Sequence, residues 1–463
     1  MGRLVAVLAW GICAAQAEPI TFYKHIAPIV YQSCSPCHRP GESGPFPLLT
    51  YTDVSKRGQL IVSVIKRPYM PPWLPEAGYG DFREERRLTG EQIRTIEEWV
   101  REGAPAGSPS DSPPLPKFVS GWQLGEPDLV IAASAPYHLR ADGPDQYWNF
   151  VLPLKAPGTR WVKAIEIRPG NLRAVHHANV VIGMHIDRSR LARVQDQAPG
   201  DGFPGMDFSG ESGTFDSDSH FLFWKPGGTP WVEPAGMAWR ADPGSDLVLN
   251  VHMRPTGKPE LVQPSIGLYF TGQPATKYPM LLPLEHDGAL DIPPGDADFP
   301  VSDDFVTPMD MDLLAVYPHA HYLGHLLEGY ATLPNGTRKW LIRIPDWDPG
   351  WQAVYHYKVP VFLPKGTVVS MRYHYDNSAA NVRNPNRPPQ RVRDGTRLPT
   401  RWHTCRCRFC HAARRTAARN WRRPSCSGAW RSIRGTSCRS STWARSCWGA
   451  APTPKPSVIC VAR

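Results

Sequence analysis

Cysteine is scarce in most of this 463-residue chain. Residues 1–390 contain three cysteines, whereas residues 391–463 contain the other seven of the ten. Outside that tail, a chain of this length with so few cysteines does not depend on disulfide bonds for its fold. Long apolar runs are also lacking after the N-terminal residues, so the sequence predicts no transmembrane segment. These absences exclude a disulfide-built scaffold and a helical membrane protein.

Acidic residues are almost absent from residues 391–463, which contain 16 Arg and Lys455 but only Asp394 as an acid. The net charge of +10 therefore belongs to this tail, because residues 1–390 carry 35 basic and 41 acidic residues. A basic excess confined to a tail does not by itself indicate a nucleic-acid-binding domain, although basic tails can bind nucleic acid. We expect no nucleic-acid partner.

Long helical patterns are also few, whereas 51 prolines and 39 glycines divide the chain into short stretches. Such a turn-rich sequence favours domains that are mainly β, and the length favours two or three of them. We expect a signal peptide at 1–17, a small α-helical domain at 18–104, a linker at 105–120, strand-rich domains at 121–275 and 276–390, and an aberrant Arg/Cys-rich tail at 391–463.

The first 17 residues have the pattern of a secretory signal peptide. Arg3 supplies the positive end, residues 4–12 the apolar core, and Ala15-Gln16-Ala17 a small-x-small cleavage site. A buried first helix is the alternative. The signal predicts a periplasmic or secreted protein.

The helical domain contains Cys34-Ser35-Pro36-Cys37-His38, the C-x-x-C-H pattern of covalent haem attachment. The thiols of Cys34 and Cys37 would add to the haem vinyl groups, and His38 would ligate the iron. A zinc site or a redox dithiol is the alternative. Met70, fixed between prolines, is the candidate sixth ligand, with a packing role as its alternative.

The same domain is expected to close with a helix, because Thr89-Gly90-Glu91-Gln92 has the capping-box pattern and Gly103 is a stop signal. The whole segment 18–104 resembles a small monohaem cytochrome c. Residues 104–117 are rich in Pro and Ser, as in a linker.

Two more histidines lie in the pattern His319-Ala320-His321, after the apolar run 311–316. The run predicts a buried strand that continues to Gly324. Residues two apart on a strand point the same way, so the two imidazoles would lie side by side. Neutral imidazole is a common metal ligand. One packed and one solvent-facing histidine is the alternative.

Three further histidines lie at the ends of predicted strands. His176 and His177 open one strand, and His252 ends another, just before Pro255-Thr256-Gly257. Adjacent residues on a regular strand face opposite ways. His176 and His177 can therefore share one metal only if the strand is bent or bulged there. The alternative, if each histidine is considered alone, is a purely structural role.

Together these motifs resemble, in order and spacing, the copper type II, ascorbate-dependent monooxygenases, the family of peptidylglycine α-hydroxylating and dopamine β-monooxygenases. The resemblance covers residues 120–390 and is closer to bacterial relatives with a cytochrome c module in front. It implies two jelly-roll β-sandwiches that each hold one copper. The implied ligands are His176, His177 and His252 for the electron-relay copper and His319 and His321 for the oxygen-activating copper.

The resemblance also implies a small organic substrate, O₂, a covalent haem c, two copper ions, and ascorbate or a redox protein as electron donor. Hydroxylation of a C–H bond is the expected reaction. The alternatives are a non-catalytic electron-transfer cytochrome with metal-binding β-sandwiches, and a cytochrome c fused to a carbohydrate-binding sandwich. The carbohydrate-binding alternative leaves the five histidines unexplained.

Two departures from the family pattern stand out. Tyr317 replaces the Arg that binds the substrate carboxylate in peptidylglycine hydroxylases, so that substrate is not expected. No Met follows Met371, so the family's Asp-Glu-Met ligand is missing. Codons for Pro399 to Trp402 permit Asp-Glu-Met in a neighbouring frame, and we hypothesise a frameshift between Asn386 and Arg401. A genuine Cys-rich metal-binding tail is the alternative, and Met371 is a possible substitute ligand.

Overall fold

The computed structural model describes residues 18–67, 69–184, 202–205, 222–284, 290–393 and 404–412. The predicted signal peptide at 1–17 and the codon window at 399–402 lie outside the described residues. The chain forms two compact units, which are described separately below. Within the described ranges, no helix has the length and apolar character needed to cross a membrane.

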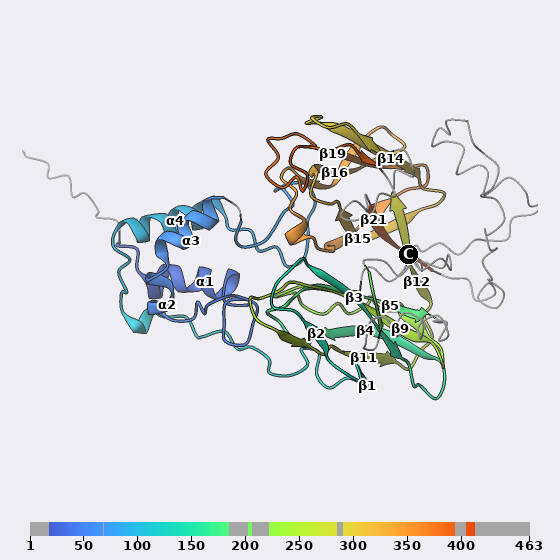
Figure 1. Ribbon diagram of the computed structural model, residues 1–463, viewed down its shortest axis with the longest axis horizontal. Coiled ribbons are helices and arrows are strands. Elements are labelled where there is room, and N and C mark those ends of the chain that lie inside the picture. Colours follow the sequence, from blue (N-terminus) through green and yellow to red (C-terminus); the bar gives the residue numbers. More distant parts are fainter. Residues whose placement is uncertain are drawn as a thin grey trace, which may run out of the picture. The chain divides into compact units, whose positions relative to one another are not determined.

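The first unit is helical and comprises Met1–Pro40, Pro45–Pro71 and Arg86–Lys117. Its elements are η1 (Phe22–Ile26), α1 (Ala27–Ser33), α2 (Tyr51–Ser55), α3 (Gly58–Lys66), α4 (Gly90–Arg101) and η2 (Pro109–Asp111) (Figure 1). The predicted capping box is present, since the Thr89 side chain accepts from the Gln92 backbone and the Gln92 side chain accepts from the Thr89 backbone. Phe22, Ile26 and Trp99 form a fully buried core.

The chain is divided differently from the expected boundaries of the helical domain and linker. Residues 104–117 belong to the helical unit, where the carbonyl of Pro105 accepts from the Phe22 backbone and from Trp99 Nε1. Pro72–Glu85, which we expected inside the helical domain, belongs to the second unit. In this segment Phe82 is buried in the core of the second unit.

The second unit is built of antiparallel sheets, so the prediction of a mainly β chain is confirmed. We call strands β1 to β11 the first β region. They are β1 (Leu129–Ala132), β2 (Tyr137–Leu139), β3 (Gln146–Pro153), β4 (Arg160–Arg168), β5 (Val175–Met184), β6 (Gly202–Pro204), β7 (Phe223–Trp224), β8 (Trp239–Ala241), β9 (Asp246–Met253), β10 (Glu260–Val262) and β11 (Ser265–Thr271). The two larger sheets have the orders β1-β11-β4-β8 and β6-β3-β9-β5-β7.

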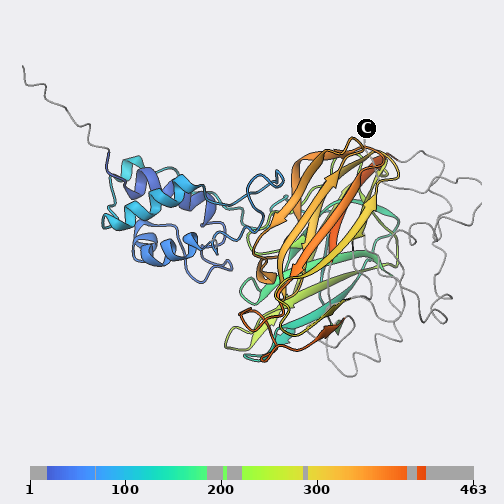
Figure 2. The ribbon, with the colours of Figure 1, turned by 90° about the horizontal axis from the view of Figure 1, so that it is seen from above.

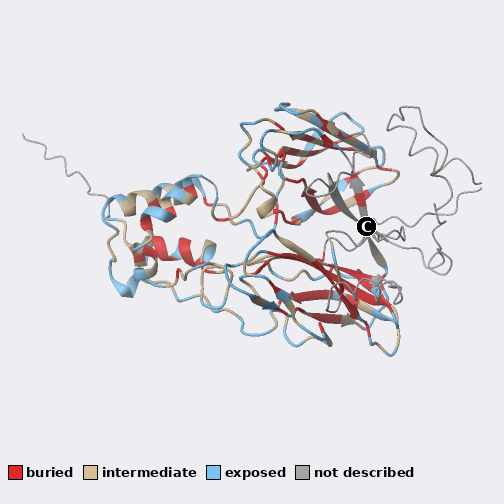
Figure 3. Cartoon of the chain, viewed as in Figure 1, coloured by how far each residue is buried: buried red, intermediate tan, exposed pale blue. Residues whose placement is uncertain are grey.

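One core joins the two larger sheets of the first β region. Val162 and Leu268 from one sheet pack in the same cluster as Phe150 and Leu249 from the other. All eight residues of β9 are buried, which is typical of a central strand covered on both faces. Figure 3 shows the buried residues along these strands in red.

Strands β12 to β21 form the second β region. They are β12 (Lys277–Leu284), β13 (Asp291–Ile292), β14 (Phe299–Val306), β15 (Met311–His319), β16 (Gly324–Thr332), β17 (Arg338–Ile344), β18 (Tyr355–Leu363), β19 (Val368–Tyr375), β20 (Val392–Arg393) and β21 (Thr404–Ala412), with η4 (Pro349–Trp351) before β18. The larger sheets have the orders β12-β21-β15-β18 and β14-β19-β16-β17. Figure 2 shows the long strands of this region in yellow to orange-red.

The second β region extends beyond its expected end at residue 390. β20 pairs with β13, and β21 lies between β12 and β15. Residues 404–412 of the tail therefore form a strand inside the sheet that carries His319. The rest of the tail, at 394–403 and 413–463, lies outside the described residues.

Candidate metal centre

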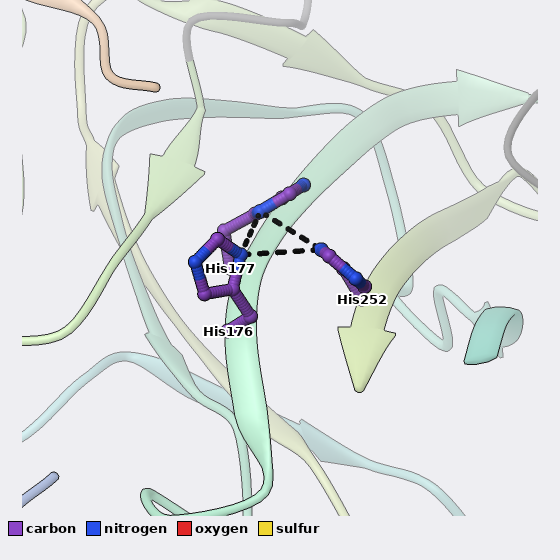
Figure 4. A group of neighbouring side chains, drawn as sticks. All are labelled: His176, His177 and His252. Atoms are coloured by element: carbon purple, nitrogen blue, oxygen red, sulfur yellow. Dashed lines mark hydrogen bonds between the residues drawn. The ribbon is translucent and has the colours of Figure 1, made fainter. Parts of the chain in front are cut away.

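Three histidines from two neighbouring strands meet in the first β region. His176 and His177 lie on β5, and His252 lies on β9, where it pairs with His177. The register shifts between Val175 and His177, which is the irregularity that two adjacent histidines need if they are to share one site. Figure 4 shows the three rings directed toward one another.

The Nδ1 atoms of the three rings form a small triangle. The distances are 3.0 Å from His176 to His177, 3.2 Å from His176 to His252 and 3.4 Å from His252 to His177. The centre of such a triangle is ~1.9 Å from each nitrogen, close to the ~2.0 Å of a metal–imidazole bond. Three imidazoles with this spacing could hold one metal ion.

The outer nitrogens of two of these rings are used as donors. His176 Nε2–H donates to the Gly350 carbonyl at 2.6 Å, and His252 Nε2–H donates to Asp145 Oδ2 at 2.7 Å. In the neutral ring the other nitrogen, Nδ1, is then an acceptor. Two buried acceptor nitrogens at 3.2 Å from each other need a donor or a cation between them. The donor set therefore fits a metal ion.

Burial keeps all three rings neutral. It is the main reason why the pKa of His176 falls to about 3, with Arg254 and His252 acting in the same direction. Burial likewise lowers the pKa of His177 far below its usual range, and it lowers the pKa of His252. Because a metal binds the neutral imidazole, these rings do not need to lose a proton at neutral pH.

The carboxylate of Asp145 supports this site from behind His252. Burial alone would raise its pKa, but the hydrogen bond from His252 and the charge of Arg254 lower the pKa overall. Tyr147 also stacks on His252, with ring centroids 4.2 Å apart. No local pattern marks Asp145, because only the pairing of β3 with β9 brings it beside His252.

Two buried asparagines face each other on β3 and β9, two residues from the pair formed by Tyr147 and His252. Asn250 Nδ2 donates to Asn149 Oδ1 at 2.8 Å, and both amides donate to the Gly205 carbonyl. This network ties β3, β9 and the β6 segment together next to His252. Buried amides that satisfy each other fix the register of the strands that carry the site.

The second pair, His319 and His321, lies at the end of β15. The prediction that both histidines lie on one strand is wrong, because β15 ends at His319 and His321 lies in the turn before β16. The turn still brings the rings together, with centroids 5.1 Å apart at 87°. Trp347 Nε1–H donates to the Ala320 carbonyl at 3.0 Å and holds this turn.

His319 presents a defined nitrogen. Its Nδ1–H donates to Gln352 Oε1 at 2.7 Å, so Nε2 is the nitrogen left to a metal. Among the described residues, the triad is the group of three His, Cys, Asp or Glu side chains whose ligand atoms converge, and His319 and His321 are not part of such a group. Met371, the possible substitute ligand, is fully buried in the core of the second β region.

The C-x-x-C-H motif follows α1 in the helical unit. Cys34 caps α1, and the backbone N–H groups of Cys37 and His38 both donate to its carbonyl. Cys34 and Cys37 are not joined by a disulfide. Burial raises the pKa of the Cys34 thiol to about 12, so this thiol is not a reactive thiolate.

His38 is oriented as an iron ligand requires. Its Nδ1–H donates to the Phe46 carbonyl at 3.1 Å, which leaves Nε2 for the metal. Burial is also the main reason why the pKa of His38 is lowered, so the ring is neutral. Met70 follows α3 and is half-buried, and its backbone N–H donates to the Val64 carbonyl. Cys34, Cys37 and His38 therefore lie in one turn after α1, as a covalent haem would need.

Comparisons with known proteins do not place the chain in a family. No family model matches it, and no curated protein matches it. Solved structures with some similarity include the major capsid protein P2 of bacteriophage PM2, with 9% identity, 55% of this chain and 99% of that chain covered, and a TM-score of 0.20. The VP2 subviral particle of infectious bursal disease virus has 10% identity, covers 61% and 72%, and has a TM-score of 0.18. Likenesses this weak carry no argument about fold or function.

Proposed function

We propose that this protein is a copper-dependent monooxygenase that hydroxylates a C–H bond of a small organic substrate. The balanced reaction takes the substrate, O₂, two electrons and two protons to the alcohol and one water. The two electrons come from ascorbate or a redox protein through a c-type haem. The protein acts in the periplasm or is secreted.

The observation that carries this proposal is the convergence of three neutral imidazoles on one point. Nδ1 atoms 3.0–3.4 Å apart, with the outer nitrogens of His176 and His252 held by Gly350 and Asp145, form a site for one metal. Imidazoles suit copper in both of its oxidation states. Such a site suits electron relay better than substrate binding.

His319 and His321 have the complementary role in this proposal. They supply two imidazoles, so positions are left for a further ligand and for O₂. When bound there, copper would supply the oxygen-activating chemistry. Tyr317, buried and stacked beside His319, gives that side of the site an aromatic wall in place of a cationic group. The substrate we propose is therefore not a carboxylate held by an arginine.

The fold assignments are part of the same proposal. We assign the paired sheets of the two β regions to two jelly-roll β-sandwiches and the helical unit to a cytochrome c domain. There Cys34 and Cys37 would hold a haem covalently, with His38 and Met70 as axial ligands. Such a haem would supply one-electron transfer, and His/Met ligation would raise its potential.

A non-catalytic electron carrier is the second candidate. One observation favours it: no Met follows Met371 in the sequence, and among the described residues the triad is the convergent group of three His, Cys, Asp or Glu side chains. Such a protein would bind haem at Cys34 and Cys37 and one metal at the triad, and it would not activate O₂.

Metal analysis of the purified full chain separates the two candidates. We expect one haem and two coppers per chain for the monooxygenase, and one haem with one copper for the carrier. His252→Ala should remove one copper, keep the haem and stop copper reoxidation by O₂ after reduction with ascorbate. His138→Ala, at an exposed histidine, is the control. A His252→Ala protein whose copper is reduced by ascorbate and reoxidised by O₂ as in the wild type would overturn the proposal.

A further inference from the structure

The segment at residues 350–352, which includes the end of η4, touches both histidine sites. The Gly350 carbonyl accepts from His176 Nε2–H at 2.6 Å. Two residues later, the side chain of Gln352 contacts His177 on one side and His319 on the other. Gln352 is 8% exposed, so these contacts are shielded from water. One short segment of the second β region thus contacts two ligands of the triad and one histidine of the pair.

The contacts of Gln352 agree on how its amide is oriented. Oε1 lies 2.7 Å from His319 Nδ1 and 3.4 Å from the hydroxyl of Tyr317. Both of these neighbours can donate a proton to a carbonyl oxygen. The amide nitrogen lies 3.0 and 3.3 Å from the two ring nitrogens of His177. A donor this close to both nitrogens of one imidazole lies over the face of the ring, where an N–H group is favoured.

We propose that Gln352 is a positioning residue that fixes the tautomer of His319 and places this ring relative to His177. Because Oε1 accepts the Nδ1–H of His319, the Nε2 atom of that ring is the one presented to a metal. The same amide packs on His177, so the orientation of His319 and that of a triad ligand depend on one side chain. Aromatic contacts run parallel to this link, since Phe223 stacks on His177 and lies beside Tyr317, which stacks on His319.

Fixing a tautomer matters because each imidazole has two nitrogens with different directions. A ligand ring that presents the wrong nitrogen must exchange its proton before it can bind a metal. Partners that hold a ligating histidine commonly change metal affinity 10–100-fold when they are lost. Ligand binding at two sites that share such a partner is also linked, and the linkage is reciprocal.

The first test measures tautomers in the metal-free full chain. Protein labelled with ¹⁵N at histidine is compared as wild type, Gln352→Leu and Gln352→Glu by long-range ¹H–¹⁵N correlation spectra. Leu keeps much of the volume but accepts no proton, whereas Glu keeps an acceptor. We expect the ratio of the Nδ1–H to the Nε2–H form of His319 to fall about tenfold in Gln352→Leu and to be retained in Gln352→Glu.

A control variant guards against a general effect of losing a glutamine amide that makes a hydrogen bond. Gln263 Nε2 donates to the Ala133 carbonyl in the first β region, a contact that involves neither histidine site. Gln263→Leu should leave the His319 tautomer unchanged. Backbone ¹H–¹⁵N spectra show whether each variant is folded. A folded Gln352→Leu protein with the wild-type tautomer ratio would overturn the inference, and so would an equal change in Gln263→Leu.

The second test uses Cu(I) alone as the probe and rests on the proposed function. Competition with a chromogenic chelator should show at least ~10-fold weaker binding at His319 and His321 in Gln352→Leu, with recovery in Gln352→Glu. Wild-type affinity in Gln352→Leu would count against the inference. If the wild type binds no copper at this pair but the tautomer changes as expected, the proposed function fails and the positioning role stands.

Discussion

The two histidine sites differ in how completely the chain builds them. The triad brings three imidazoles within 3.4 Å of one another, and hydrogen bonds to Gly350 and Asp145 set the outer nitrogens of two of them. The pair has two imidazoles, of which His319 is set by Gln352. The triad therefore offers three convergent imidazoles to one metal, whereas the pair offers two.

This difference follows from where the histidines lie. The triad is on β5 and β9, two central strands whose pairing fixes the distance between His177 and His252. The pair straddles the end of β15, where the strand gives way to a turn. A pair of central strands gives closely spaced ligands, whereas the end of a strand spreads them over a strand and a turn. Our proposal of an electron-relay site at the triad and a reactive site at the pair depends on this difference.

The largest effect should come from removing a triad ligand. A structural zinc site with four ligands gains about 10–16 kcal/mol from its metal, or about 3 kcal/mol per ligand, so by analogy His252→Ala should weaken copper binding at the triad ~100-fold. Copper titration followed by elemental analysis measures this loss. His319→Ala should change the triad affinity far less, through the shared contact of Gln352 with His177. Equal losses at both sites in either variant would break the comparison.

Acid should destabilise the metal-free protein through the triad. The pKa of His176 is about 3 in the folded protein, mainly because of burial, against ~6.5 in an unfolded chain. Between these values the unfolded state binds more protons, so stability rises with pH and falls as the solution is acidified. From pH 7 to pH 5 this ring should cost about 2 kcal/mol.

Urea unfolding of chelator-treated protein measures that slope. His176→Gln removes the titrating ring and should flatten the decline between pH 7 and pH 5. The variant should otherwise keep the fold, because His176 lies at the start of β5, next to the bulge. An unchanged slope would show that the triad does not bury a neutral His176.

A smaller effect should come from the carboxylate behind His252. Asp145→Asn keeps an acceptor for His252 Nε2–H but removes the negative charge, so copper affinity at the triad should fall ~10-fold. Isothermal titration with copper measures the change. Asp142→Asn is the matched control, because Asp142 is exposed three residues away. An equal loss of copper affinity at the His319 and His321 pair would show that Asp145 does not act mainly on the triad.

The smallest effect on copper affinity should come from the turn that carries the pair. Trp347→Phe removes the hydrogen bond to the Ala320 carbonyl and part of a fully buried side chain, so it should lower stability by about 2–3 kcal/mol. Copper affinity at the pair should fall a few-fold while the triad keeps its affinity. Thermal unfolding with and without copper tests this. An equal fall in copper affinity at the triad would show that the turn held by Trp347 acts on both sites.

Much of the secondary structure could be predicted from local patterns. The turn Pro334-Asn335-Gly336 joins β16 to β17 as its sequence indicates, with Gly336 at a φ of 82° that favours glycine. The capping box at Thr89 was equally visible, because both of its hydrogen bonds join residues three apart. Turns and helix caps of this kind depend on residues that are close in the chain, so they can be predicted from the sequence.

Contacts between distant residues could not be predicted in this way. Asp145 and His252 are 107 residues apart, and Gln352 and His177 are 175 residues apart. Pro72–Glu85 also belongs to the second unit and not to the helical domain in which we expected it, because Trp73 and Phe82 pack on Tyr355 of β18. No local pattern marks such partners, since their apolar or polar character is shared by many residues that lie elsewhere.

The sequence by itself determined which side chains are available for metal and haem chemistry: five histidines in three short motifs, and two cysteines with an adjacent histidine. Only the tertiary structure decided which nitrogens converge, where β15 ends and which residues hold the rings in place. The physical reason is that the type of a ligand is a property of one residue. Its direction depends on strand pairing, bulges and hydrogen bonds from remote parts of the chain.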